Sequence, residues 1–449
     1  MKGKMNMNNV PDSSFLQFRP WKLLLLSILC ALCMWTYFYR VLIAHQVRES
    51  TARGTPRGNL SDLYPRWLGA RELLLHGRDP YSPEFTREIQ AGYYGRPLDP
   101  DAPGERNYQQ GFYYPVYVAF CLAPTIHLSF ETVRKGFFWV LLGLTLTTVP
   151  LWPFVLRWSV PVWVYVSLVV FTIGSLPFIE GLMLQQITLF VVPLLIVALA
   201  LFASGHPIPA GVLLAFATIK PQLVWLLLFW LMIWTLADWR RRCRWAVSFL
   251  LTMVILFAAS EWYLPHWIPR FLQAIREYHN FTGEMSVMDE MIGAVWGRAL
   301  EVSALAILIG ICWKERRVAA NTEAFALTLS LVLAITVLVV PSYGLYNQVL
   351  LIPALLIMLR DRRTIWRRNI ANRVLSMITI ALIGWPWISG FALAGLSFIL
   401  PRETVERAWA VPLWTALQIP LAVSALILVH YYQGYYQRTI TASAGPRSS

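Results

Sequence analysis

The chain has 449 residues, of which 57% belong to the apolar class and only 14% are charged. Soluble domains carry roughly 25% charged residues, so this composition excludes an ordinary soluble protein and indicates several membrane-spanning helices. The net charge of +14 would suggest nucleic-acid binding in a soluble protein. Here the arginines cluster in short loops between apolar runs, where they orient a membrane protein, and we therefore exclude nucleic acid as a partner.

The apolar runs divide the chain into five parts. We predict a cytoplasmic tail over residues 1–20, a first transmembrane helix over 21–44, an extracytoplasmic loop with amphipathic helices over 45–113, a multi-helix transmembrane region over 114–432 and a cytoplasmic tail over 433–449. The first run is too long for the core of a signal peptide and lacks a small-residue cleavage pattern, so we expect it to remain as an anchor. The five cysteines lie in or beside apolar runs and form no disulfide framework or metal-ligand pattern.

At about 20 residues per crossing, the sequence predicts about twelve transmembrane helices. Their expected ranges are 21–44, 114–130, 136–156, 160–179, 187–203, 209–235, 246–264, 291–313, 323–341, 348–359, 371–393 and 409–432. The predicted fold is an all-α polytopic membrane protein with a folded first extracytoplasmic loop. Basic residues cluster at 2–22, 240–244, 314–317 and 360–368. With twelve crossings all four clusters share one side, so we predict both termini in the cytoplasm and loop 45–113 outside. The membrane is expected to be the plasma membrane.

The polar segment 59–81 follows the first apolar run and predicts an amphipathic helix on a surface, such as the bilayer interface. Ser61 or Asp62 can cap its start and Gly77 can close its end. Its apolar residues recur at helical spacing, at Leu63, Trp67, Ala70 and Leu74. A second helix is expected to begin with Ser82 as cap and Pro83 in the first position, and to end at Gly92.

Asp62 has two interpretations, and the simpler one is helix capping. The functional one is catalysis: a hydroxyl that attacks the anomeric carbon of a sugar phosphate must lose a proton, which a positioned carboxylate can accept. The departing phosphate then needs cations, and Arg66 and Arg71 follow on the same predicted helix.

Lys220 is a costly charge in the middle of the apolar run 210–235, and Pro221 after it can loosen the helix. It could bind a lipid phosphate, or it could form a structural pair with a carboxylate such as Glu180; the sequence leaves both open. Gln185 and Gln186 interrupt two apolar runs, where they either fill a turn, which we favour, or line a polar cavity.

Tyr346 and Asn347 lie in a polar and aromatic stretch, residues 341–348, expected at the outer membrane face. Their side chains could hydrogen-bond sugar hydroxyls. An ordinary aromatic belt at the membrane surface explains the same pattern slightly better.

These motifs together resemble glycosyltransferase family 87, the polyprenol-phosphate-mannose-dependent mannosyltransferase group with the C-type glycosyltransferase fold. One anchor helix precedes a long first loop that opens with an aspartate, and about ten apolar runs follow. The matching residues are Ser61-Asp62-Leu63, Trp67-Leu68-Gly69-Ala70-Arg71, Leu74, Gly77-Arg78-Asp79-Pro80-Tyr81, Tyr114-Pro115, Gln186, Ala210-Gly211 and Ile219-Lys220-Pro221-Gln222.

The resemblance implies that one sugar, expected to be mannose, moves with inversion from a polyprenyl-phosphate carrier to a glycolipid or glycan acceptor at the outer face of the lipid bilayer. It makes Asp62 the catalytic base. Lys220, Arg66 and Arg71 are then expected at the donor phosphate, and Gln186, Tyr346 and Asn347 at the substrate.

The chain departs from the family pattern at two places. Gln185 stands where the family has glycine, and Tyr346-Asn347 stand where some members have a histidine pair. The sequence Asp99-Pro100-Asp101 has the D-x-D pattern of some metal-dependent glycosyltransferases, but it lies in a proline-rich loop, so we predict no metal. A lipid-linked donor also needs no nucleotide or other cofactor, and the chain has no glycine-rich phosphate loop.

The main alternative is a transporter or flippase of lipid-linked sugars, which would have paired broken helices in two related halves. A polysaccharide polymerase would be expected to carry its large outer loop late in the chain, whereas here it comes first. A non-catalytic scaffold would not need an intramembrane lysine such as Lys220.

Overall fold

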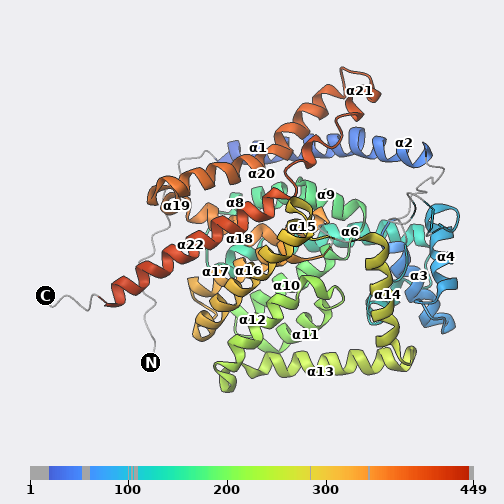
Figure 1. Cartoon of the computed structure of the whole chain (residues 1–449), viewed down its shortest axis with the longest axis horizontal. Coiled ribbons are helices and arrows are strands. Elements are labelled where there is room, and N and C mark those ends of the chain that lie inside the picture. Colours follow the sequence, from blue (N-terminus) through green and yellow to red (C-terminus); the bar gives the residue numbers. More distant parts are fainter. Residues whose placement is uncertain are drawn as a thin grey trace.

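The computed structural model describes residues 20–52, 61–99, 101–102, 105, 110–283, 285–341 and 344–443. Within these ranges the regular elements are all helices, which confirms the predicted all-helical membrane protein (Figure 1). Several expectations fall outside the described residues: the tail 1–19, the start of the polar segment at 59–60, the middle residue of the D-x-D pattern, residues 342–343 and the end of the chain, 444–449.

Six helices in the described ranges are long and apolar enough to cross a membrane. Two of them are single helices, α13 (Trp239–Tyr263) and α20 (Ile370–Leu396). The first span, Pro20–Ala52, consists of α1 (Pro20–Tyr37), a π-helical segment (Phe38–Ile43) and α2 (Ala44–Ala52), and the span Phe130–Val155 consists of α6 (Phe130–Thr148) and α7 (Leu151–Val155). The span Ala294–Arg317 consists of α16 (Ala294–Lys314) and η6 (Glu315–Arg317), and the span Arg402–Gly434 contains α21 (Arg402–Glu406), η8 (Val411–Leu413) and most of α22 (Gln418–Ser443). A seventh span results if the pair α8 (Val162–Ile173) and α9 (Leu176–Met183), bent by 58°, counts as one.

The remaining helices are shorter. The apolar ones are α10 (Thr188–Ala203), α11 (Pro207–Ala217), α12 (Trp225–Leu236), α17 (Glu323–Val339) and the segment Leu345–Arg360, which joins the 3-10 helix η7 (Leu345–Leu351) to α18 (Ile352–Arg360). The others are α3 (Leu63–His76), α4 (Pro83–Tyr94), α5 (Val118–Leu122), η4 (Ala123–Thr125), η5 (Pro221–Leu223), α14 (Trp267–Thr282), α15 (Val287–Ile292) and α19 (Arg362–Arg368). About 20 residues are needed to cross the hydrocarbon core, so twelve full-length spans are not found in the described ranges.

Two of the expected spans are broken by proline. Residues 114–130 form only α5 and η4 rather than one long helix, because Pro115 and Pro124 each remove a backbone donor. The expected helix 209–235 is divided into α11 and α12, and the break falls at Lys220 and Pro221. The second interruption therefore falls at a predicted polar site residue, Lys220.

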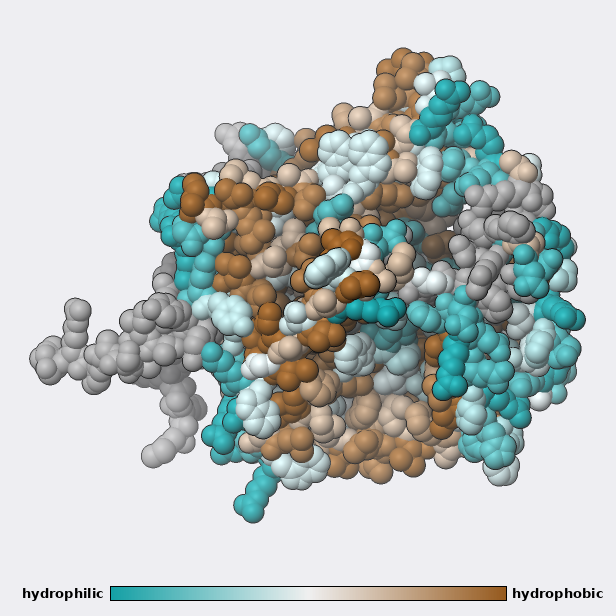
Figure 2. Space-filling view, in the orientation of Figure 1, coloured by the Kyte–Doolittle hydropathy of each residue, from teal (hydrophilic) through white to brown (hydrophobic). Residues whose placement is uncertain are grey.

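The short helices form the centre of the molecule, whereas long helices present apolar side chains outward. In α17, 15 of the 17 residues are buried. By contrast α13 exposes Leu251, Val254 and Ile255, and Figure 2 shows hydrophobic surface over the edge that α13 forms. Buried short helices surrounded by longer apolar ones are suited to a lipid environment, because the lipid-facing side chains need no polar partner.

Polar residues gather at two opposite ends of the molecule. Figure 1 places α19 and the start of α13 at one end, and α3, α4 and α14 at the other. Arg242 at the first end donates hydrogen bonds to the carbonyl oxygens of Arg316 (2.8 Å) and Arg317 (3.3 Å), so two of the basic clusters meet there. The apolar band lies between these ends.

Helix α3 is packed against the transmembrane helices. The predicted apolar positions Leu63, Trp67 and Ala70 are buried, and Trp67 Nε1 donates a hydrogen bond to the carbonyl oxygen of Thr125 (3.3 Å). Gly77 closes the helix in a left-handed conformation with φ of 65°, as predicted. The helix therefore lies against protein along its apolar side, and not with that side in the bilayer interface.

Helix α4 begins as predicted and ends later. The backbone N–H of Phe85 donates to the Ser82 hydroxyl (3.2 Å), and Pro83 occupies the first turn. The helix does not end at Gly92 but continues to Tyr94, with Gly95 as its left-handed cap. Gly92 instead packs closely on α3, because a Cβ atom there would lie 2.1 Å from the hydroxyl oxygen of Tyr64.

Close packing of α11 against α13 depends on Gly211. A Cβ atom at this position would lie 2.2 Å from the carbonyl oxygen of Trp245, a backbone atom that cannot rotate away. We expect Gly211→Ala to destabilise the protein by about 1–3 kcal/mol and to lower its thermal unfolding midpoint in detergent. Gly143→Ala in α6 is the matched control, because no atom lies within 4 Å of the added Cβ. Equal midpoints for the two variants would contradict this packing.

Candidate active site

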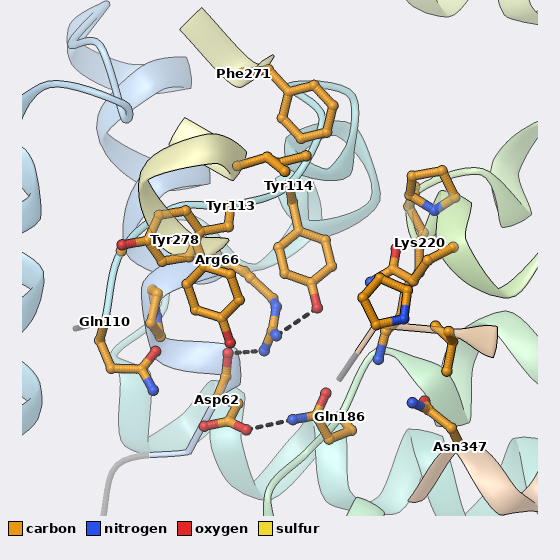
Figure 3. Close-up of a pocket in the computed structure, with 18 of the residues that line it drawn as sticks. Asp62, Arg66, Gln110, Tyr113, Tyr114, Gln186, Lys220, Phe271, Tyr278 and Asn347 are labelled. Atoms are coloured by element: carbon orange, nitrogen blue, oxygen red, sulfur yellow. Dashed lines mark hydrogen bonds between the residues drawn. The ribbon is translucent and has the colours of Figure 1, made fainter. Parts of the chain in front are cut away.

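A cavity of about 300 Å³ opens between the first loop and the transmembrane helices (Figure 3). Its wall includes six of the seven residues predicted for the site: Asp62, Arg66, Gln186, Lys220, Tyr346 and Asn347. These residues come from segments that are far apart in the sequence. The fold therefore brings the predicted carboxylate, cations and amides into one place.

The carboxylate of Asp62 is held by two hydrogen-bond donors. Gln186 Nε2 donates to Oδ2, and the hydroxyl of Tyr93 donates to Oδ1 (3.2 Å). The backbone N–H of Asp62 also donates to the carbonyl oxygen of Leu184 (3.1 Å). Asp62 thus joins α3 and α4 to the turn before α10.

The capping hypothesis for Asp62 is wrong. Asp62 occupies the N-cap position of α3, but its side chain makes no capping hydrogen bond. The backbone N–H of Leu63 donates instead to the Ser61 hydroxyl (3.3 Å). The Asp62 carboxylate is therefore available to the cavity and to Gln186.

Arg66 lies one helical turn after Asp62, so both side chains leave α3 on the same face. Its Nη1 donates to the carbonyl oxygen of Asp62, and Nη2 donates to the hydroxyl of Tyr114 (2.6 Å). Burial of the guanidinium opposes its charge, but Tyr114 and Asp62 outweigh burial and raise the pKa of Arg66 above its usual value. The cavity wall thus keeps a buried positive charge, only 8% exposed.

Lys220 is directed into the cavity by the break between α11 and α12. Pro221 disfavours helical backbone at the residue before it, and Lys220 accordingly adopts φ −125° and ψ 76°. Its Nζ donates to the hydroxyl of Thr188 (2.7 Å) and lies 4.7 Å from the centre of the Tyr346 ring. Thr188 in turn donates to Asn347 Oδ1 (3.0 Å).

The turn at residues 184–186 fills the space between helices and also lines the cavity. Gln185 has φ of 52°, in the left-handed region where glycine is favoured. This conformation explains why a glycine would suit the position. Gln185 Nε2 donates to the carbonyl oxygen of Arg134. Gln186 is 3% exposed, and its Oε1 has no hydrogen-bond partner in the described structure.

Tyr346 and Asn347 lie in η7 and line the cavity, so they do not form the outer aromatic belt that the sequence pattern slightly favours. Asn347 is 2% exposed. Gly344 allows the Tyr346 ring to fold back, because a Cβ atom at this glycine would lie 2.4 Å from the ring.

Arg71 is not among the residues that line the cavity. Its guanidinium lies 5.5 Å from the centre of the Trp67 ring, on the same helix. Asp99 and Asp101 of the D-x-D pattern lie in the first loop, where the backbone N–H of Asp101 donates to Asp99 Oδ1 (2.9 Å). Among the described residues, no three histidine, cysteine or acidic side chains are grouped as a metal ion would require.

Sequence reasoning does not identify several residues that line the cavity or contact its polar groups. Tyr93 and Tyr114 were not singled out as partners of Asp62 and Arg66. Phe271 and Ile275 of α14, which the sequence does not mark, also line the cavity together with Tyr278 of the same helix. Their spacing of four and three residues indicates that they share one face of an amphipathic helix, but it does not reveal what that face covers.

An all-helical membrane protein whose polar cavity joins a carboxylate to two buried cations has the parts of a membrane-embedded transferase. The family model of glycosyltransferase family 87 matches residues 112–341, slightly more than half of the 449 residues. The chain therefore belongs to glycosyltransferase family 87 and is a membrane glycosyltransferase. The matched region includes Gln186 and Lys220 and ends before η7. No protein in the curated collection matches the chain.

The strained backbone at Gln185 yields a stability test. Gln185→Gly and Gln185→Ala both remove the side-chain bond to Arg134, so their difference isolates the backbone conformation. We expect the glycine variant to be more stable by about 1 kcal/mol, because a Cβ atom is unfavourable at positive φ. Thermal unfolding in detergent would measure the difference. An alanine variant as stable as the glycine variant would contradict a left-handed residue here.

Proposed function

We propose that this protein transfers a single sugar, expected to be mannose, with inversion from a polyprenyl-phosphate carrier to an acceptor hydroxyl. The observation that carries the proposal is the meeting of Asp62, Arg66 and Lys220 in one cavity wall. A carboxylate can serve as the base, and two cations are suited to a phosphate leaving group.

The proposed reaction is a single displacement. Asp62 takes the proton of the acceptor hydroxyl while its oxygen forms a bond to the anomeric carbon of the sugar. The bond between that carbon and the phosphate oxygen breaks, and the polyprenyl phosphate leaves with the electron pair. Arg66 and Lys220 stabilise the negative charge on the departing phosphate. One displacement inverts the configuration at the anomeric carbon.

The neighbouring polar residues are assigned supporting roles. Tyr93 and Gln186 hold the two carboxylate oxygens of Asp62 in a fixed direction. The unpartnered Oε1 of Gln186 can accept a hydrogen bond from a sugar hydroxyl. Tyr346 and Asn347 are assigned to the substrate beside Lys220. The proposal does not use Arg71, because that residue is not among those lining the cavity.

We also propose that the reaction takes place at the outer face of the plasma membrane, with both termini in the cytoplasm. The basic residues that meet around Arg242 support this orientation, because positively charged loops remain in the cytoplasm. Arg66, which lines the cavity, belongs to α3, and Figure 1 places α3 toward the opposite end.

A transporter or flippase of lipid-linked sugars is the second candidate. The observation that favours it is a second broken span, the α8–α9 pair bent by 58°, in addition to the break at Lys220. Transporters build substrate sites from such discontinuous helices. A transporter, however, needs no carboxylate base, so substitution of Asp62 separates the two functions.

Asp62→Asn removes the base and nearly preserves the shape of the side chain. We expect the sugar-transfer rate to fall by about 10²–10⁴-fold in a reconstituted assay with a polyprenyl-phosphate sugar and a lipid extract. Asp238→Asn, at the start of α13, serves as the matched control and should retain the wild-type rate. A folded Asp62→Asn protein that transfers sugar at the wild-type rate would rule out this mechanism.

Lys220→Met removes the charge and preserves the length of the side chain. We expect the KM for the polyprenyl-phosphate donor to rise by about tenfold or more, because a charge-assisted hydrogen bond to phosphate is lost. Lys220→Arg, which keeps a cation, should show a smaller rise. Donor affinity that is unchanged in the methionine variant would give Lys220 a structural role only.

A further inference from the structure

Helix α14 forms an aromatic wall of the cavity that the proposed mechanism does not use. The helix follows the span α13, and its residues Phe271, Ile275 and Tyr278 share one face and line the cavity. Arg270 Nη1 donates to Asp79 Oδ2 (2.6 Å), which attaches α14 to the first loop. Figure 1 shows α14 at the same end of the molecule as α3 and α4. This wall therefore has a fixed position relative to Asp62.

Two tyrosines from different elements meet at one edge of this wall. The ring centres of Tyr113 and Tyr278 are 4.5 Å apart, and the rings are inclined by 39°. Both side chains are half-buried, and both line the cavity together with Gln110. Gly111 permits the arrangement, because a Cβ atom there would lie 2.7 Å from the Tyr113 hydroxyl. The result is a pair of aromatic surfaces beside an amide.

The position of this pair relative to the catalytic groups is informative. Figure 3 shows Gln110, Tyr113 and Tyr278 toward one end of the cavity in this view, and Lys220 and Asn347 toward the other. In a displacement with inversion, the attacking oxygen and the leaving oxygen lie on opposite sides of the anomeric carbon. When Lys220 holds the phosphate of the donor, the attacking molecule therefore approaches from the side where the tyrosines lie.

We propose that Gln110, Tyr113 and Tyr278 form an acceptor subsite that binds a saccharide ring and presents one of its hydroxyls to Asp62. The inference rests on the proposed function, since it requires a donor at Lys220 and a base at Asp62. A sugar ring has one face of C–H bonds, which packs against the negative face of an aromatic ring. Its hydroxyls need donors and acceptors together, and an amide such as Gln110 supplies both.

Steady-state kinetics in lipid nanodiscs test this subsite. The donor is polyprenyl-phosphate mannose, and the acceptor probes are the octyl glycosides of mannose, glucose and galactose, with octanol as the saccharide-free control. We expect transfer to at least one glycoside and little to octanol. Tyr278→Ala should raise the glycoside KM by about tenfold or more, while the donor KM and the hydrolysis of donor by water stay unchanged.

Three further variants separate this role from a general loss of structure. Tyr278→Phe keeps the ring and should retain a glycoside KM within about twofold of the wild type. Gln110→Ala should raise the glycoside KM without changing the donor KM, which provides a second test if Tyr278→Ala fails to fold. Trp262→Ala removes an aromatic ring that is 85% exposed on α13 and should leave both KM values unchanged. An unchanged glycoside KM in the Tyr278 and Gln110 alanine variants, a parallel rise in donor KM, or octanol as an equally good acceptor would overturn the proposal.

Saturation-transfer NMR distinguishes failure of the subsite from failure of the proposed function. The Asp62→Asn protein is mixed with each octyl glycoside in the absence of donor, with and without Tyr278→Ala. We expect saturation of the sugar ring protons with the Asp62→Asn protein. This signal should be lost with the protein that carries both Asp62→Asn and Tyr278→Ala. Ring saturation that persists without Tyr278, or that is absent from both proteins, overturns the subsite. If this binding result holds and the wild type does not use the donor, only the proposed function has failed.

Discussion

The hydrogen bond between Gln186 and the Asp62 carboxylate is the contact on which the site depends, because it joins the first loop to the membrane-embedded helices. A carboxylate inside a mostly apolar molecule needs donors, and Tyr93 on α4 supplies a second one. Three separate segments must therefore be in place before Asp62 has a defined direction. The first loop is in this sense a part of the cavity site and not an appendage to the transmembrane helices.

Broken helices make this arrangement possible. A continuous helix satisfies its own backbone and carries its side chains outward at a regular spacing, so it concentrates few polar groups in one place. Here α9 and α10 are separated by the turn of Gln185 and Gln186, and α11 and α12 by the break at Lys220. Each interruption directs one polar side chain into the cavity. The left-handed backbone of Gln185 accompanies the first interruption, and the proline after Lys220 accompanies the second.

Buried charge and aromatic surface divide the cavity wall into two regions. Arg66 and Lys220 are each close to a tyrosine ring, with Arg66 4.3 Å from the centre of Tyr114 and Lys220 4.7 Å from that of Tyr346. The negative faces of these rings partly offset the loss of water around each cation. The wall formed by α14 has an aromatic and aliphatic face instead. The proposed donor, a lipid-linked sugar phosphate, and the proposed saccharide acceptor present the same contrast of charge and apolar ring surface.

Composition by itself indicated a membrane protein, because 57% apolar residues together with only 14% charged residues differ from a soluble domain, which carries roughly 25% charged residues. Short motifs also marked Asp62, Lys220 and Gln186, because polar residues in apolar surroundings are costly. Only the tertiary structure decided that Asp62 does not cap α3, that Arg71 does not line the cavity, and that Tyr93 and Tyr278 come close to the site. Periodicity reports which face of a helix is apolar, but the partner of that face is set by long-range packing. The prediction of about twelve full-length spans is too high for the same reason. Short apolar helices such as α17 are buried by their neighbours and need not reach both membrane surfaces.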